Sequence, residues 1–351
     1  MADVYQIRPL SDVRWNEFLT RHPRASVFHS AHWLSALQKT YGFEPFALTT
    51  SRPGESLDNA LVFCCVNSPL TGRRLVSLPF SDHCASLVSG EDDLAFLTSA
   101  MQSQLADRRI RYAELRPVEP LPDSGPCQTT LTYRWHHLDL TADIDEIYGK
   151  FHRDCVVRKI RRAEREHLLY RKGSFGEYFE QFWNLHLQTR RRHSAPPQPV
   201  SWFRHLLSEF REEAVIHLAF QSDTPIAAIF TLEYKGTIVY KYGCSDPRLQ
   251  ALGGTQLLFW RLIQDAKSRG ICTLDLGRSA YSNKGLIQFK DRWGAQASDL
   301  VYSRFTSDAG SGAGYRGRPD SLPLVLARRA ISHLPNRLLA ATGTLLYKHI
   351  A

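Results

Sequence analysis

A group of charged and polar residues near position 280 offers the clearest chemistry in the chain. A short apolar run reaches Asp275-Leu276-Gly277-Arg278-Ser279, and after the polar bridge 280–285 comes Phe289-Lys290-Asp291-Arg292-Trp293-Gly294. Fixed cations on both sides of a flexible bridge suit a site that holds an anionic ligand and excludes water. An ordinary ion pair between Arg278 and Asp275 at a strand end is the structural alternative.

Positive charge is also concentrated earlier in the chain. Between Lys150 and Lys172 there are nine basic residues against three acidic ones, and Arg190-Arg191-Arg192 form a second cluster. The formal net charge of the chain is +9. This excess favours an anionic partner, such as a nucleotide, a tRNA, a phospholipid surface or a polyphosphate-linked glycan precursor. The alternative is an ordinary solvated helix face.

Size and composition narrow the class of protein. The 351 residues are enough for two domains, and 43% hydrophobic with 23% charged residues is typical of a globular protein. The first residues lack the basic start and apolar core of a signal peptide, so we expect a cytoplasmic location. The seven cysteines form no Cys-x-x-Cys pair, and the 14 histidines show no metal-ligand spacing. We therefore expect reduced thiols and no metal site.

An internal repeat predicts the architecture. After a shift of 161 residues, the segment Val76–Leu115 falls in register with Thr237–Leu276, and both have the pattern strand, loop, helix, strand. The pairs Leu97/Met101 and Leu258/Leu262 share the i, i+4 spacing that buries one helix face. We expect helices over 94–108 and 255–269, strands over 75–79, 112–115 and 237–242, and a turn at Lys235-Gly236. The sequence predicts two copies of one α/β unit.

Several motifs together resemble the FemAB-like proteins of the N-acetyltransferase (GNAT-like) superfamily. Asp275–Ser279 followed by Phe289–Gly294 is similar to their C-terminal signature. The resemblance extends to four further segments over most of 20–305: Ser26–His29 with Trp33, Leu78–Asp82, Val157–Ala163 and Pro225–Ala228. It implies an α/β protein with two tandem GNAT-like domains, each a mixed central sheet flanked by helices. We expect domains at 1–142 and 143–306, the second with the active site.

The segment 307–351 is expected to be a mobile linker followed by a basic amphipathic stretch. Residues 307–317 are rich in glycine and serine, whereas 322–351 mix leucines with arginine and lysine. This stretch either packs back on the protein or lies on a membrane surface.

Three residues are predicted to be catalytic. By resemblance, Lys290 matches the lysine placed near the acyl donor and the developing oxyanion, with an exposed structural lysine as its alternative. Asp82 is the candidate base or amine-orienting carboxylate, or else a loop cap. Tyr242, at a strand end, is a candidate donor to the acyl carbonyl, or else a core-edge tyrosine.

The predicted binding residues form two sets. Arg278 has the planar fork for a carboxylate or phosphate. It is joined in the substrate-binding set by Phe289, Asp275, Arg158, Lys159, Arg161 and Arg162, of which the last four resemble the family's basic helix. The cofactor-binding set is Gln250, Gly253, Gly254 and Thr255, which approximates a glycine-rich phosphate loop with the second glycine one position early. A simple turn before a helix is its alternative.

The sequence thus predicts an N-acyltransferase that uses acyl-CoA or aminoacyl-tRNA and acts on an amine of a cell-envelope glycan, peptidoglycan or exopolysaccharide precursor. Its expected partners are an anionic small-molecule or lipid-linked glycan precursor, tRNA, and the inner membrane surface through the C-terminal segment. Two other classes stay open. One is a non-catalytic module that binds nucleic acid or a membrane surface on a decayed transferase fold. The other is an accessory protein of polysaccharide export that uses only the C-terminal segment.

Overall fold

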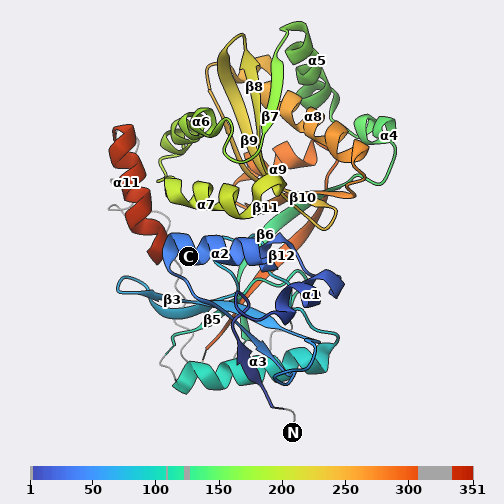
Figure 1. Ribbon diagram of the computed structural model, residues 1–351. Coiled ribbons are helices and arrows are strands. Elements are labelled where there is room, and N and C mark those ends of the chain that lie inside the picture. Colours follow the sequence, from blue (N-terminus) through green and yellow to red (C-terminus); the bar gives the residue numbers. More distant parts are fainter. Residues whose placement is uncertain (1–2, 108–109, 122–126, 307–333, 351) are drawn as a thin grey trace. The chain divides into compact units, whose positions relative to one another are not determined.

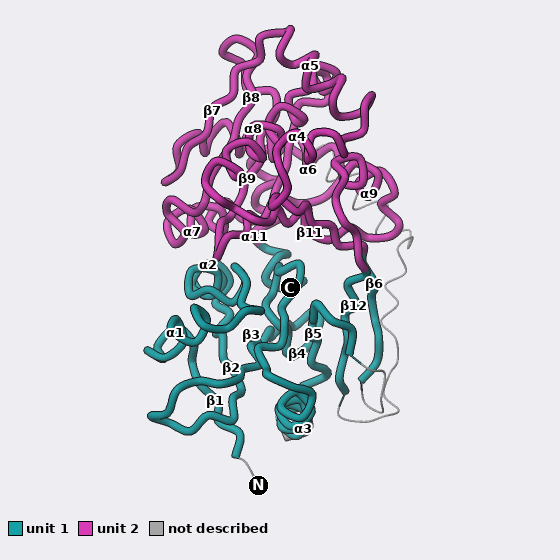
Figure 2. The backbone as a smooth tube through the Cα atoms, turned by 90° about the vertical axis from the view of Figure 1, so that its right-hand side faces the viewer, with its two compact units in different colours: residues 1–133, 299–317, 345–351 teal, residues 134–298, 318–344 magenta. Residues whose placement is uncertain are grey.

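The computed structural model describes residues 3–107, 110–121, 127–306 and 334–350, which form two compact units (Figure 2). Unit 1 contains the described residues of 1–133, 299–317 and 345–351, and unit 2 those of 134–298 and 318–344. The chain leaves unit 1 within strand β6 (Cys127–Asp139) and returns to it within strand β12 (Gln296–Phe305).

Unit 1 is built on a mixed sheet. Its strands follow the order β1 (Tyr5–Ile7), β2 (Pro45–Thr49), β3 (Leu61–Ser68), β4 (Gly72–Val76), β5 (Ala113–Leu115) and β12. Neighbours from β1 to β4 are antiparallel, β4 and β5 are parallel, and β5 pairs antiparallel with β12 through Leu115 and Ser303.

Helices and tight turns complete unit 1 (Figure 1): α1 (Arg14–Arg21), η1 (Val27–His29), α2 (Ala31–Tyr41), α3 (Glu91–Asp107) and η5 (Tyr347–His349). The ends of α2 are specified by sequence. The Ser30 hydroxyl accepts the Trp33 amide at its start, and Gly42 takes a left-handed φ of 70° at its end. Helix α3 buries Leu97, Met101 and Leu105 against the sheet.

The strands of unit 2 are also mixed in direction. The unit 2 part of β6 is followed by β11 (Thr273–Ala280), β10 (Thr237–Ser245), β9 (Thr224–Tyr234), β8 (Ala214–Gln221) and β7 (Leu169–Gly173). Strands β10 and β11 are parallel, and the others from β7 to β10 pair antiparallel. The predicted turn between β9 and β10 is confirmed, with positive φ at Lys235 and Gly236.

The helices of unit 2 cover both faces of this sheet (Figure 1). Helices α6 (Phe179–Arg192) and α7 (Val200–Phe210) lie on one face, and α8 (Gly254–Ser268) with α5 (Arg158–Arg165) on the other. The remaining elements are α4 (Ile144–Gly149), the π-helical turn η2 (Arg153–Val157), η3 (Arg211–Glu213), η4 (Gln250–Leu252), α9 (Lys284–Asp291) and α11 (Asn336–Leu346), whose last two residues belong to unit 1.

The predicted repeat is confirmed by topology. In unit 1, β4, α3 and the parallel strand β5 follow one another, as do β10, α8 and β11 in unit 2. Leu97, Met101, Leu258 and Leu262 are all buried, as the i, i+4 pattern predicts.

The predicted domain boundary after residue 142 differs from the compact units. Residues 134–142 group with unit 2, and 299–306 return to unit 1. The return has a physical reason, because β12 supplies unit 1 with the strand that pairs with β5.

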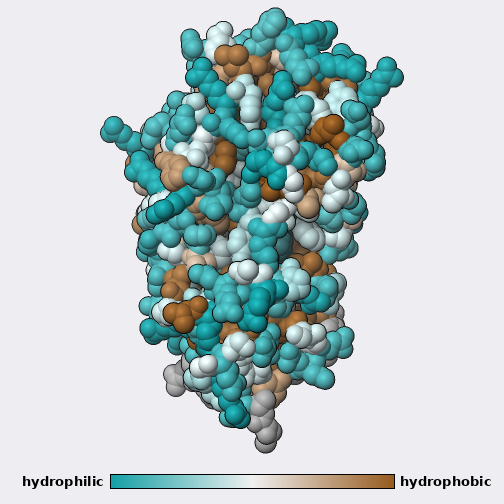
Figure 3. Space-filling model, turned by 45° about the vertical axis from the view of Figure 1, so that its right-hand side comes forward, coloured by the Kyte–Doolittle hydropathy of each residue, from teal (hydrophilic) through white to brown (hydrophobic). Residues whose placement is uncertain are grey.

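The surface is mixed in character. The face drawn in Figure 3 is largely hydrophilic, with apolar side chains in separate small patches. No helix among the described residues combines the length and apolar character needed to span a membrane. The segment predicted to be a mobile linker lies outside the described residues, as does the first part of the predicted amphipathic stretch.

Candidate functional site

The parallel strands β10 and β11 separate at their carboxyl ends. Their register runs from Thr237/Thr273 to Val239/Asp275, although β10 continues to Ser245 and β11 to Ala280. In the described part of the chain, the backbone of β10 beyond Val239 therefore has no ladder partner on the β11 side. Backbone amides in such an opening are available to a ligand that lies between the strands.

A β-bulge at Lys241 reverses the direction of the side chains at this opening. The pairing of β10 with β9 shifts register between Tyr240 and Tyr242. As a result, Tyr240 contacts Phe259 of α8 with ring centroids 4.8 Å apart, whereas Tyr242 points to the opposite face of the sheet. Burial raises the pKa of Tyr240, so its hydroxyl keeps its proton at neutral pH.

Tyr242, predicted to be catalytic, lies in an aromatic cluster. Its hydroxyl accepts a hydrogen bond of 2.8 Å from Trp202 Nε1, and its ring packs edge-on against Phe203 at 4.8 Å. The ring of His186 lies 5.9 Å away. This position agrees with the core-edge alternative for Tyr242, and its proposed role in catalysis stays a prediction.

The predicted glycine-rich loop opens α8. Gly253 has φ of 84°, and a Cβ there would lie 2.3 Å from the backbone oxygen of Lys159 in α5. A Cβ at Gly254 would lie 3.0 Å from Ile226 Cδ1. Packing thus explains both glycines, because α5 and β9 approach the start of α8 too closely for a larger side chain.

The start of α8 also offers its helix dipole to an anion. Its first turn contains no acidic residue, and the half-buried Lys159 lies beside it on α5. Thr255 is half-buried in this turn, whereas Gln250 is exposed and donates to Ser245 Oγ at 2.9 Å. A helix N-terminus next to a cation favours a phosphate.

The rest of the predicted basic helix faces solvent. Arg158 and Arg161 are exposed on α5, and exposed Arg162 lies 3.5 Å from Glu166. This part of the set therefore provides a positive surface next to the start of α8.

Lys290, the leading catalytic candidate, is buried in unit 2. Its side chain is 2% exposed, and its ammonium donates to the backbone oxygens of Gly277 at 2.8 Å and Arg278 at 3.2 Å. The alternative of an exposed structural lysine is wrong. The contacts fix the ammonium at the end of β11, where they also join α9 to that strand.

The neighbours of Lys290 have mainly structural contacts. Buried Asp275 accepts from Trp135 Nε1 at 2.8 Å and from the Gly277 amide at 2.7 Å. Phe289 packs 5.7 Å from Phe259 in the core of unit 2. Arg278 is half-buried on β11, next to the carbonyl group that accepts from Lys290.

One histidine–carboxylate pair at this site was not predicted from the sequence. His136 of β6 is fully buried, and its Nε2 lies 3.0 Å from Asp291 Oδ1 of α9. Burial lowers the pKa of His136, the Asp291 carboxylate opposes that shift, and nearby Lys290 adds to it. Asp291 was visible in the motif beside Lys290, but nothing in the His136-His137 dipeptide indicated its partner.

Asp82, the predicted base, belongs to unit 1. Its backbone oxygen accepts a hydrogen bond of 2.6 Å from Tyr302, and its side chain is half-buried. Its role as a base or an amine-orienting carboxylate stays a prediction. Among the described residues, no group of three or more His, Cys, Asp or Glu side chains is placed to hold a metal ion.

Comparison with known proteins identifies the type of domain. Residues 150–291 match the family model described as an acetyltransferase (GNAT) domain. This part of the chain is therefore similar to a GNAT-type acetyltransferase domain. The opening between β10 and β11 and the start of α8 both lie in this GNAT domain.

Solved structures show that the fold is shared over most of the chain. The structure of FemX matches with a TM-score of 0.68 at 13% identity, covering 86% of this chain and 97% of FemX. The C-terminal domain of a putative lysylphosphatidylglycerol synthetase from Agrobacterium fabrum gives 0.57 at 12%, covering 92% and 95%. A tandem GNAT protein from the clavulanic acid biosynthesis pathway gives 0.51 at 10%, covering 87% and 98%.

No curated protein sequence matches the chain. The predicted FemAB-like, tandem GNAT architecture is confirmed by the domain match and by these folds. The chain is therefore a mixed α/β protein with an acyltransferase fold of the GNAT class.

Proposed function

We propose that this protein transfers an acyl or aminoacyl group from an activated donor to an amine. The observation that carries the proposal is the opening between β10 and β11 within the GNAT domain. There, the acyl carbonyl of the donor accepts hydrogen bonds from the β10 backbone, and the amine attacks its carbon. The donor leaves as a thiol or as a tRNA hydroxyl, and the amine loses one proton to a base.

The phosphates of the donor are proposed to bind at the start of α8. The helix dipole and Lys159 supply positive potential there, and exposed Arg158 and Arg161 extend it along α5. This arrangement suits the pyrophosphate of an acyl-CoA, and the exposed arginines also suit the backbone of an aminoacyl-tRNA. A charge reversal, Lys159→Glu, is expected to raise the KM for the donor about tenfold.

Lys290 is proposed to stabilise the negative charge that develops on the acyl oxygen. Its ammonium is held rigidly at the end of β11 by two carbonyl groups, so little reorganisation is needed during the reaction. Arg278 on the same strand is proposed to bind a carboxylate or phosphate of the acceptor. Asp82 and Tyr242 remain proposals for the base and for a carbonyl donor.

The acceptor is proposed to be an amine on an anionic precursor of a cell-envelope glycan, peptidoglycan or exopolysaccharide. The net charge of +9 and the exposed arginines of α5 support an anionic acceptor. FemX and the lysylphosphatidylglycerol synthetase domain share the fold.

Contact with a lipid-linked precursor at the inner membrane surface is proposed to involve α11 and the residues after it. Leu338 is 55% exposed, Leu345 63% and Ile350 57%, and Lys348 lies among them. Exposed leucines next to a cation are typical of a segment that lies on an anionic membrane.

Acyl transfer by a Lys290→Met variant tests the proposal. A model amine is supplied with acetyl-CoA or with aminoacyl-tRNA, and donor binding is followed by thermal shift. We expect kcat to fall by about 100-fold or more, since this is the order lost when one oxyanion donor is removed. Lys284→Met is the matched control, because Lys284 is exposed at the other end of α9.

Two results would count against the proposal. One is unchanged turnover in the folded Lys290→Met variant, which removes this lysine from the chemistry. The other is the absence of any thermal shift or turnover with either donor at saturation. If Lys290→Met does not fold by circular dichroism, the Lys159→Glu variant provides the test through KM.

A second candidate is a non-catalytic module that binds an anionic surface. The exposed arginines of α5 and the exposed leucines of α11 favour it, since neither set is required for acyl transfer itself. It predicts binding to anionic vesicles or tRNA with a steep salt dependence and no effect of Lys290→Met. Acyl transfer by the purified protein would refute it.

A further inference from the structure

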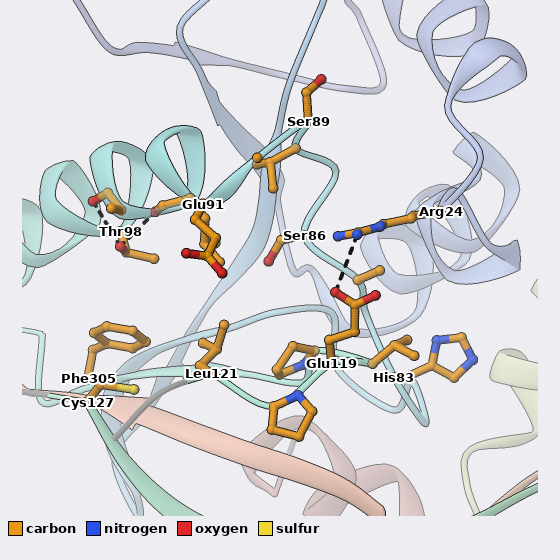
Figure 4. A pocket seen from close by; sticks show the side chains of 18 residues that line it. Arg24, His83, Ser86, Ser89, Glu91, Thr98, Glu119, Leu121, Cys127 and Phe305 are labelled. Carbon is orange, nitrogen blue, oxygen red and sulfur yellow. Dashed lines mark hydrogen bonds and ion pairs between the residues drawn. The ribbon is translucent and has the colours of Figure 1, made fainter. Parts of the chain in front are cut away.

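Unit 1 contains a cavity of its own, with a volume of about 620 Å³ (Figure 4). This is within the range of about 300–1,000 Å³ that is usual for small-molecule sites. Its walls are largely apolar and include Val88, Leu94, Leu121 and Phe305. Polar groups from α3 and from the loops around it complete the lining.

The cavity lies at the place in unit 1 that corresponds to the proposed donor site of unit 2. Its lining comes from residues 83–91, which follow β4 and lead into α3, and from 117–121, which follow β5. These two segments follow the carboxyl ends of two parallel strands, a place where α/β sheets commonly bind ligands, whereas Phe305 lies opposite Ala113 at the start of β5. The proposed donor site has the same relation to β10, α8 and β11.

The walls of the cavity are held by hydrogen bonds. Ala60 and Leu87 exchange two backbone hydrogen bonds of 2.7 and 3.1 Å. The Cys84 amide donates to the Arg116 carbonyl at 2.6 Å, and buried His29 Nε2 lies 3.0 Å from the Ala85 carbonyl. A ligand would therefore enter a site that is largely formed in advance.

The charges at the two sites are opposite. The first turn of α3 contains Glu91, Asp92 and Asp93, whereas the first turn of α8 contains no acidic residue. Acidic residues at this place offset the positive helix end and repel a phosphate. The unit 1 cavity is therefore unsuited to the anionic ligand proposed for unit 2.

Two features of the lining select a cation instead. The exposed Glu91 carboxylate points into the cavity from α3 (Figure 4), and among the described residues it has no hydrogen-bond or ion-pair partner. At the other end of the cavity, Arg24 and Glu119 neutralise each other across 3.3 Å. The hydroxyl of Ser86 also faces the space. The lining thus has one unpaired negative charge beside apolar walls.

We propose that unit 1 binds an amine-bearing amphipathic molecule in this cavity, with its ammonium on Glu91 and its apolar body against Leu94, Leu121 and Phe305. This is a second ligand site, and it stands independently of acyl transfer in unit 2. The walls take up the apolar part, and the carboxylate determines the sign of the head group.

A pair of matched probes tests the sign of the head group. 4-Phenylbutylamine and 4-phenylbutyrate have the same apolar body and opposite charges, and their binding to the full-length protein is measured by ligand-observed NMR titration. We expect the amine to bind and the acid to bind at least about fivefold more weakly. Equal binding of the two probes, or stronger binding of the acid, would overturn the proposal.

Substitutions locate the site. Glu91→Gln is expected to weaken binding of the amine at least about fivefold, whereas Asp92→Asn, one residue further along the same turn and outside the lining, leaves it unchanged. Ala95→Trp fills the cavity from an exposed position on α3 and is expected to abolish binding without loss of the far-UV spectrum. Amine binding that survives Ala95→Trp, or that responds equally to Asp92→Asn, would show that the probe binds elsewhere.

Discussion

Replacement of Gly253 by alanine tests how closely α5 approaches the start of α8. Gly253 has φ of 84°, and the new Cβ would lie 2.3 Å from the Lys159 carbonyl oxygen. The left-handed conformation costs an alanine about 1 kcal/mol. The overlap with a backbone atom adds about 1–3 kcal/mol, since neither helix end can move without a loss of packing. We expect a total loss of about 2–4 kcal/mol in the free energy of unfolding.

Gly270→Ala is the matched control. Gly270 belongs to the same unit and has φ of 74°, but a Cβ there would meet no atom within 4 Å. It should therefore lose only the conformational part, about 1 kcal/mol. Urea denaturation followed by far-UV circular dichroism compares the two variants, with the slope m checked for constancy. If both variants lose the same free energy of unfolding, the close approach of α5 is refuted, and Gly253 is required only for the turn before α8.

Three further predictions concern ionisable groups. Burial raises the pKa of Glu114, but Arg116 and Arg304 lower it more. The stabilisation by the Glu114 carboxylate should thus be complete above pH 4.5, the pKa of an unperturbed Glu, and be lost as the pH falls through the lower pKa of Glu114 in the folded protein. Glu114→Gln should lower the free energy of unfolding by about 3 kcal/mol at pH 7, as measured by urea denaturation. Burial lowers the pKa of His217 to about 3 from 6.5, so it opposes folding progressively below pH 6.5. In the His217→Gln variant, the urea concentration at the unfolding midpoint should therefore decrease less between pH 6.5 and pH 4 than in the unsubstituted protein. The same decrease in both proteins would contradict this. Asp291→Asn should lower the pKa of His136 further, because the opposing carboxylate charge is lost; a rise in an NMR titration would disprove the contact.

The repeat and the main elements of the site could be predicted because their signals are local. The i, i+4 spacing of leucines marks the helices that cover each sheet, and Lys235-Gly236 marks a hairpin turn. The expected helix 255–269 corresponds to α8 (Gly254–Ser268), within one residue at each end. The motif around Lys290 indicated a place near the acyl donor, which stays a prediction, and the structure shows that the lysine is buried.

The remaining features depend on contacts between distant residues. His136 and Asp291 are 155 positions apart, so their pairing follows only from the placement of β6 beside α9. Position 253 requires a glycine because the carbonyl oxygen of Lys159, almost one hundred residues earlier, leaves no room for a Cβ. The cavity of unit 1 is formed by loops that carry no motif, and the return of β12 to unit 1 depends on strand pairing with β5.

The return of β12 limits how this protein can be divided for study. A fragment that stops near residue 142 would leave β5 with an open edge, and Glu114 would lose its ion-pair partner Arg304. Such a fragment is expected to aggregate when it is expressed alone. A recombinant version that joins residues 299–306 to the end of the first segment through a short linker should fold, and it would allow the cavity of unit 1 to be studied apart from unit 2.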